Sequence, residues 1–265
     1  MINNEDLARS KEWIKVTFQG SVFFQSTLLL ENGFKHAFFT KKVSKNEPRK
    51  LLNLISDNSS IHFLKQVHGN KVIYASKSNA AKIIKADSII SDKHSQSLWI
   101  YTADCIPILL GDSKTGHVAA IHSGWKGLVQ KIIKNTIEKL ELNGSNRKNI
   151  LVAIGPAISL DNYQVDEEIV MKIYESIKKS KCYQSKDILN YMRSINSIEL
   201  DLKRHKYLLD IRKVAKEQFL LEGFDRNQIS VNSNCTFQEA HMFESWRREH
   251  SKSRQWSFIQ SRMFK

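Results

Sequence analysis

Short hydrophobic runs with strand character fill the first half of the chain. Between residues 36 and 123, β-branched and aromatic residues gather in compact runs separated by polar and turn-forming residues. Such runs are typical of β-strands. The predicted strands cover residues 36–40, 61–68, 71–76, 97–103, 106–112 and 117–123.

Helical periodicity appears after residue 123. One amphipathic helix is predicted over 127–142, because apolar side chains recur there at steps of three and four residues. These side chains are Leu128, Ile132, Ile133, Ile137 and Leu140. Two more helices are predicted at 165–180 and 209–223, the second with Asp210 as its N-cap and Gly223 just past its end. Strands return at 150–158, 228–237 and 254–260.

This order of elements predicts the fold class. Strands grouped early and helices placed mainly later favour an α+β fold with mixed β-sheets flanked by helices over a regular βαβ alternation. The chain has no internal repeat and no linker rich in Pro, Gly or Ser. We therefore expect 1–265 to form a single domain, with 1–30 as a peripheral N-terminal segment.

Composition narrows the class of protein. The 265 residues are 41% hydrophobic, enough to bury a sizeable core, and the first residues lack the apolar centre of a secretion signal. No apolar stretch is long enough to span a membrane. Three scattered cysteines do not resemble a disulfide framework. These features predict a cytoplasmic protein without membrane contact.

The charge is strongly positive. Lys and Arg number 41 against 27 Asp and Glu, which gives a net charge of +14. Such a field attracts anions, including phosphate and nucleic acid. The lysines are dispersed and are not interleaved with aromatic residues in one stripe, so nucleic acid is the less favoured partner.

Chemically active residues interrupt two of the predicted strands. In "HVAAIHS", alternation places His122 on the same face as Val118 and Ala120, and a short turn joins this strand to the one after Cys105 as a hairpin. Cys105 and His122 are then either core neighbours or parts of a site. His68, followed by a glycine as in the "HSG" of His122, supplies a third candidate ligand. Two His and one Cys without a CxxC spacing fit a metal site with one open position.

Several blocks together resemble a bacterial family. "KQVHGN", "ADSIISD", "TADCIPILL", "AAIHSGWKGL" and "FESWRREHSKSRQ" follow the order and spacing of proteins variously called multicopper polyphenol oxidase (laccase), purine nucleoside phosphorylase and peptidoglycan editing factor. The similarity runs from about Phe38 to the end. It implies a fold similar to the catalytic domain of cytotoxic necrotizing factor. It also implies that His68, Cys105 and His122 bind the metal.

The resemblance implies an activity and a set of partners. The activity is phosphorolysis of purine nucleosides, namely adenosine, inosine and 5′-methylthioadenosine, to free base and ribose 1-phosphate, together with deamination of adenosine. Zinc is the expected metal and copper the alternative. Asp104 is the candidate acid/base. Because strand alternation directs it away from Cys105, a carboxylate that supports the site or the structure, without acid/base chemistry, is the alternative unless the chain kinks there. Lys126, Arg247 and Arg248 are the candidate phosphate-binding residues. We expect a monomer or homodimer.

Other function classes stay open at this stage. They are a copper-loaded phenol oxidase, a peptidoglycan-precursor editing factor and a non-catalytic RNA- or anion-binding protein. The chain departs from the family pattern at two positions, where Lys41 and Lys126 each stand in place of an Arg. Lysine keeps the charge but lacks the planar group that binds phosphate through two hydrogen bonds, so the substrate-binding surface is expected to differ there. Outside the ligand set, Cys235 is expected in the core, Cys182 as an exposed thiol, and His241 and His250 in solvent.

Overall fold

Two six-stranded sheets form the centre of the molecule. The computed structural model describes residues 12–43, 47–55, 59–78, 81–178, 185–202 and 204–262. The first sheet has the order β1 (Trp13–Phe18), β2 (Ser21–Ser26), β3 (His36–Phe39), β15 (Gln255–Gln260), β7 (Gln96–Thr102) and β4 (Ser60–Phe63). Its strands are antiparallel except for the pair β4 and β7.

The second sheet carries most of the predicted strands. Its order is β14 (Ile229–Val231), β10 (Ile150–Ile154), β8 (Ile106–Asp112), β9 (Val118–Ser123), β6 (Ser88–Ile90) and β5 (Val72–Tyr74). Parallel pairs at both edges flank antiparallel pairs in the middle. A three-stranded sheet adds β11 (Gln164–Val165), β13 (Lys206–Leu209) and β12 (Ile198–Asp201). The predicted α+β fold with mixed sheets is therefore confirmed.

Eight helices surround these sheets in the described part of the chain. They are α1 (Thr27–Glu31), α2 (Pro48–Leu52), α3 (Trp125–Val129), α4 (Ile132–Leu142), α5 (Glu167–Ile177), α6 (Ser185–Ser194), α7 (Ile211–Leu221) and α8 (Trp246–Glu249). Single 3₁₀ turns occupy Lys41–Val43, Ala75–Lys77, Arg147–Asn149, Leu160–Asn162 and Arg226–Gln228. None of the helices in the described ranges is long and apolar enough to cross a membrane.

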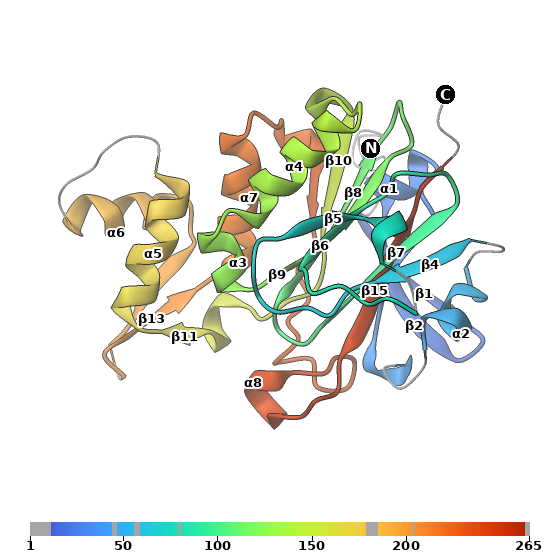
Figure 1. Cartoon of the computed structure of the whole chain (residues 1–265). Coiled ribbons are helices and arrows are strands. Elements are labelled where there is room, and N and C mark those ends of the chain that lie inside the picture. The colour runs from blue at the N-terminus through green and yellow to red at the C-terminus, as the bar shows by residue number, and fades with distance from the viewer. Residues whose placement is uncertain are drawn as a thin grey trace, which may run out of the picture.

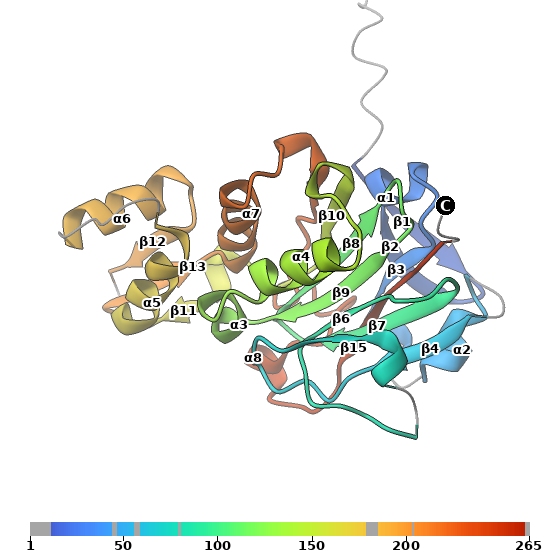
Figure 2. The same ribbon diagram turned by 45° about the horizontal axis from the view of Figure 1, so that its top comes forward.

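The second sheet is covered on both faces. Helices α3, α4 and α7 lie on one side of it and the first sheet on the other (Figure 1). Along β9, Ala119 and Ile121 belong to the helix-side core, whereas Val118 and Ala120 belong to the core between the sheets. The predicted alternation in this strand is confirmed, because a period of two assigns each side chain to one of two buried layers. Figure 2 shows the same layers, with β11, β12 and β13 carried beside α5 and α6.

One predicted helix is wrong in its extent. The 127–142 segment contains two helices, α3 and α4, separated by Gln130 and Lys131. Lys131 has φ 59°, in the left-handed region, which an α-helix does not continue through. Helix α7 matches its prediction closely. Asp210 accepts hydrogen bonds from the backbone N–H groups of Arg212 and Lys213, and Gly223 beyond the end has φ +87°.

Part of the N-terminal segment belongs to the first sheet and is less peripheral than predicted. From residue 13 it forms β1 and β2, and every residue of β2 is buried. β2 pairs with β3 inside the first sheet, so this part of the expected peripheral segment 1–30 contributes to the core. Sequence patterns also gave no indication of β12, β13 or α6.

Candidate metal centre

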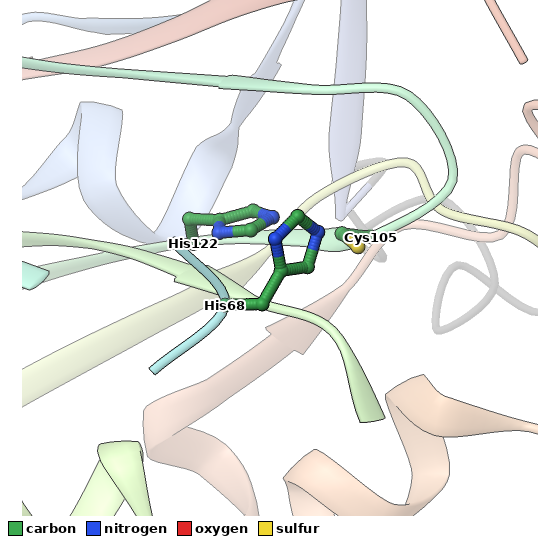
Figure 3. Close-up of side chains that lie close together, drawn as sticks. All are labelled: His68, Cys105 and His122. Carbon is green, nitrogen blue, oxygen red and sulfur yellow. The ribbon is translucent and has the colours of Figure 1, made fainter. Parts of the chain in front are cut away.

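Three side chains from separate parts of the chain converge beside the second sheet. His68 lies in the loop after β4, Cys105 between β7 and β8, and His122 in β9. Their donor atoms all lie within 4.8 Å of one another, close enough for one metal ion. The two imidazole rings meet edge to face with centroids 4.7 Å apart, and Cys105 lies beside them (Figure 3).

Strand pairing places His122 near Cys105. β8 and β9 form the predicted antiparallel hairpin, in which His122 lies opposite Pro107. Cys105 immediately precedes β8. The hairpin prediction is confirmed. The predicted strand 61–68, by contrast, ends at Phe63, so His68 belongs to a loop, where its φ is 59°.

The chain kinks at the residue before Cys105. The sequence "YTADC" was expected to be extended, but β7 ends at Thr102 and Asp104 has φ 84°. This turn carries the chain from the first sheet, which contains β7, to the second sheet, which contains β8. The strand alternation that directs Asp104 away from Cys105 therefore does not apply here, and the kink brings the Cys105 thiol to the edge between the sheets.

Asp104 is held by three donors. Its Oδ1 accepts from the Thr236 hydroxyl at 2.7 Å. Its Oδ2 accepts from the Ser245 hydroxyl at 3.0 Å and from the backbone N–H of Arg247 at 2.7 Å. These bonds compensate the buried carboxylate and hold it in the left-handed conformation. The contacts favour a positioning role, and the acid/base role stays a prediction.

Gly124 leaves room for the thiol. A β-carbon at this position would lie 2.8 Å from Cys105 Sγ and 3.6 Å from His68 Cδ2. The backbone of Gly124 is extended, so conformational strain does not require a glycine here. Close approach to the sulfur is the physical reason for a glycine between β9 and α3.

Without a metal, the site favours a thiolate beside an imidazolium. Burial by itself raises the pKa of Cys105, but the charge of His122 and hydrogen bonds from His122 and His68 outweigh it and lower the pKa to about 6. Burial by itself lowers the pKa of His122, but the Cys105 thiolate and Asp87 raise it to about 9. A thiolate is the form in which cysteine binds metal ions.

A cavity of about 930 Å³ opens over the three donors. His68, Cys105 and His122 line it together with aromatic and basic side chains. The aromatic ones are Tyr101, Trp125, Tyr163 and Trp246. The basic ones, among the residues that the structure describes, are Lys126, Arg204, Lys206, Arg247 and Arg254. Such a volume accommodates a ligand of nucleoside size, and the positive wall suits an anion.

The predicted anion-binding residues separate into two groups. Lys126 and Arg247 line the cavity, and the Arg247 guanidinium lies 5.0 Å from the centre of the Tyr163 ring. Arg248 is not part of the cavity lining within the described residues. Its guanidinium donates to the carbonyls of Thr236, Phe237 and Phe243 and pairs with Glu249. These contacts tie α8 to the loop of residues 232–245 that precedes it.

The remaining predicted positions lie outside the cavity lining. Cys235 is buried, and its sulfur accepts a hydrogen bond from the backbone N–H of Ser159. His241 and His250 are exposed. Cys182 lies outside the described residues. Sequence patterns gave no indication of a role for Asp87, whose side chain is fully buried and accepts a hydrogen bond from His122 Nδ1 at 2.8 Å.

Comparison with known proteins assigns the family. A family model described as "multi-copper polyphenol oxidoreductase laccase" matches residues 30–262. The chain belongs to this family. It is 36% identical over 260 residues to "Purine nucleoside phosphorylase slr1573" of Synechocystis sp., covering 94% of this chain and 97% of that protein. It is 30% identical over 203 residues to "Purine nucleoside phosphorylase YfiH" of Escherichia coli, covering 74% and 72%.

Solved structures of low identity share the fold. YlmD from Geobacillus stearothermophilus superposes with a TM-score of 0.78 at 21% identity, covering 94% of this chain and 99% of that one. YfiH from Bacillus licheniformis gives a TM-score of 0.73 at 23% identity, covering 91% and 96%. The "multi-copper" part of the family description fits this member poorly. In the part of the chain that the structure describes, His68, Cys105 and His122 form the one group able to hold a metal ion.

Proposed function

We propose that the protein is a zinc-dependent purine nucleoside phosphorylase. Its substrates are adenosine, inosine or 5′-methylthioadenosine and inorganic phosphate, and it also deaminates adenosine. The names of the relatives in Synechocystis and E. coli support the reaction class. We place the activity in the cytoplasm, in a monomer or homodimer.

The donor set beneath the cavity carries this proposal. Two imidazoles and one thiolate within 4.8 Å match the ligands that zinc prefers, and three protein ligands leave a coordination position for substrate or water. When bound, zinc supplies a Lewis acid that increases the acidity of water and withdraws electron density from a coordinated purine.

The chain's own residues hold the reactants. Lys126 and Arg247 bind phosphate at the cavity wall, where one phosphate oxygen attacks C1′ of the ribose. The C1′–N9 bond breaks, its electron pair passes to the purine, and the purine takes up the proton that the attacking hydrogen phosphate releases. Trp125 and Trp246 supply aromatic surface for the purine ring.

Asp104 at the cavity lining and Arg248 outside it hold the segment that carries Arg247. The Asp104 carboxylate holds the backbone N–H of Arg247 at 2.7 Å, which fixes the start of α8 at the cavity edge. Arg248 ties α8 to the loop containing Thr236 and Phe237. In this proposal Asp104 is the positioning residue for Arg247, and Arg248 stabilises the loop that precedes α8.

Product analysis of the purified protein tests the function. Adenosine is incubated with zinc-loaded protein with and without phosphate, and the products are separated by chromatography and identified by mass spectrometry. The proposal expects adenine and ribose 1-phosphate only with phosphate. It expects inosine to accumulate without phosphate and to be converted to hypoxanthine when phosphate is present. Free ribose without any phosphate requirement would indicate a hydrolase instead. His122→Ala serves as the metal-site variant, and Asp92→Asn, whose carboxylate contacts Ser76 and Gln96, as the control.

A copper-loaded phenol oxidase is the second candidate. The family description and the mixed nitrogen and sulfur donors favour it. Multicopper oxidation requires several copper centres with many more His ligands than one group of three supplies. Oxidation of a phenol by copper-loaded protein, with no nucleoside turnover by the zinc-loaded form, would select this candidate. Inactivity in both assays would direct attention to peptidoglycan precursors or anion binding.

A further inference from the structure

We infer that Asp87 is the positioning residue for both histidine donors of the metal centre. This inference rests on the proposed function only through the metal site. Asp87 immediately precedes β6 and its side chain is fully buried. Asp87 itself is not among the residues that line the cavity in the described part of the chain, and none of the hydrogen bonds there joins its carboxylate to the Cys105 thiol, so any effect on the metal passes through the histidines.

Asp87 binds His122 with its side chain and its backbone. Oδ1 accepts from His122 Nδ1 at 2.8 Å, and the backbone carbonyl of Asp87 accepts from the backbone N–H of His122 at 2.8 Å. The pairing of β6 with β9 sets this geometry, because Ser88 lies opposite Ile121 in the adjacent register position. A proton on Nδ1 leaves the Nε2 lone pair for the metal and fixes the ring orientation.

The same carboxylate organises the loop of His68. Oδ1 accepts from the backbone N–H of His68 at 2.8 Å and of Val67 at 3.1 Å, and Oδ2 accepts from that of Gly69 at 2.8 Å. His68 has φ 59°, a left-handed conformation that is strained for a non-glycine residue. Three consecutive N–H groups converging on one buried carboxylate stabilise this turn and direct the imidazole toward Cys105.

The thiol is positioned by a separate carboxylate. Asp104, adjacent to Cys105, accepts from Thr236, Ser245 and the backbone of Arg247. None of these residues contacts Asp87 in the described hydrogen bonds. Loss of the Asp87 carboxylate should therefore displace the two imidazoles and leave the thiolate in place. This separation gives the inference a spectroscopic signature that general unfolding does not share.

Asp87→Asn is the test variant. Asparagine keeps the size of the side chain but has one acceptor oxygen, whereas the donors around Asp87 bind to two carboxylate oxygens. Its NH₂ group would face N–H donors in place of the second oxygen. Asp92→Asn is the matched control. Asp92 follows β6, and its carboxylate likewise accepts a backbone N–H, a hydroxyl and an amide, from Ser76 and Gln96, with no contact to a metal donor.

The measurement is zinc affinity by competition with a chromophoric chelator. Loss of such a partner of a metal-binding histidine typically lowers metal affinity about 10- to 100-fold, and we expect this for Asp87→Asn but less than a twofold change for Asp92→Asn. In the Co²⁺-loaded variant, the thiolate-to-metal charge-transfer band should persist while the d–d bands change. Unchanged affinity and spectra in Asp87→Asn, or equal losses in both variants, would overturn the inference.

A second measurement uses the unmodified protein, in case Asp87→Asn does not fold. In ¹⁵N-histidine-labelled, zinc-loaded protein, long-range proton–nitrogen correlation should show a proton on His122 Nδ1 and the metal on Nε2. A metal on Nδ1 would overturn the role of Asp87. Neither measurement contains a nucleoside, so the inference can hold when phosphorolysis fails, and it can fail when phosphorolysis is observed.

Discussion

The Asp104 carboxylate accepts a hydrogen bond from the backbone N–H of Arg247 over 2.7 Å. This contact joins the residue before the Cys105 thiol to the residue whose guanidinium lies above Tyr163. The metal centre and the positive cavity wall therefore share one buried group. A displacement of Asp104 should affect both.

Asp104→Asn separates a positioning role from acid/base chemistry. Asparagine tolerates the left-handed conformation but cannot accept from all three donors, so we expect a loss of about 1–3 kcal/mol in the free energy of unfolding. The KM for phosphate should rise, so that kcat/KM for phosphate falls, and the shape of the pH–rate profile should stay unchanged. Denaturant titration and steady-state kinetics check these values. Loss of one limb of the pH profile in a fully stable variant would assign acid/base catalysis to Asp104 instead.

Arg247 and Arg248 should respond differently to the same substitution. Arg247→Gln is expected to raise the KM for phosphate about tenfold, because a hydrogen bond to a charged group contributes about 1.5 kcal/mol. Arg248→Gln should leave that KM unchanged and lower stability by about 1–3 kcal/mol, because three carbonyls lose their donor. Measuring both KM and unfolding free energy for each variant makes the pair its own control. A higher KM for phosphate in Arg248→Gln and an unchanged KM in Arg247→Gln would instead assign phosphate binding to Arg248.

The strand geometry of the site could be predicted from sequence, and its turns could not. The two faces of β9 and the hairpin to β8 follow from a period of two and a short turn. The break at Lys131 has no glycine or proline to indicate it. The kink at Asp104 depends on donors more than a hundred residues away in sequence, at Thr236, Ser245 and Arg247.

Asp87 illustrates the same limit within the site. In "ADSIISD" it has the appearance of a polar residue ahead of a short strand. Its partner His122 is 35 positions away and becomes a neighbour only when β6 pairs with β9. Residue types predicted the three donors, but the carboxylate that orients two of them required the sheet register.

Gly124→Ala should weaken metal binding by steric contact alone. The added methyl group would lie 2.8 Å from Cys105 Sγ, so the thiolate must move. We expect zinc affinity to fall about tenfold or more, with a destabilisation of about 1–3 kcal/mol from overpacking. Gly69→Ala is the control, because its methyl group would meet Asp87 Oδ2 at an ordinary 3.6 Å. Equal zinc affinities in the two variants would contradict this account of Gly124.

His36 should make stability depend on pH outside the site. Its Nδ1 donates to the Phe34 carbonyl, its Nε2 accepts from the Ser26 N–H, and burial lowers its pKa from 6.5 to about 4. The unfolded chain therefore binds more protons between these values, and the free energy of unfolding falls as pH drops from about 6.5 to 4. The full loss is about 3 kcal/mol, since each pKa unit corresponds to about 1.4 kcal/mol. Denaturant titrations across this range should show the slope, and His36→Gln should reduce it. An equal slope in the variant would assign the pH dependence to other groups.

Alkylation of Cys105 distinguishes a metal ligand from a nucleophile. In metal-free protein the thiol has a pKa of about 6, so it is a thiolate at neutral pH and should react readily with iodoacetamide. The rate should fall as pH drops through about 6, because protonation removes the reactive form. Zinc should protect the sulfur, so that modification begins only after a strong chelator removes the metal.

Peptide mapping by mass spectrometry assigns the modified residue. Buried Cys235 supplies an internal control, because it should react only after unfolding. The Cys105→Ala variant should lose both bound zinc and activity, because it lacks one of the three metal ligands. A cysteine nucleophile activated by His122 would instead be alkylated in the untreated enzyme. Its Cys105→Ala variant would keep bound zinc and lose all turnover, and that result would reject the ligand role of Cys105.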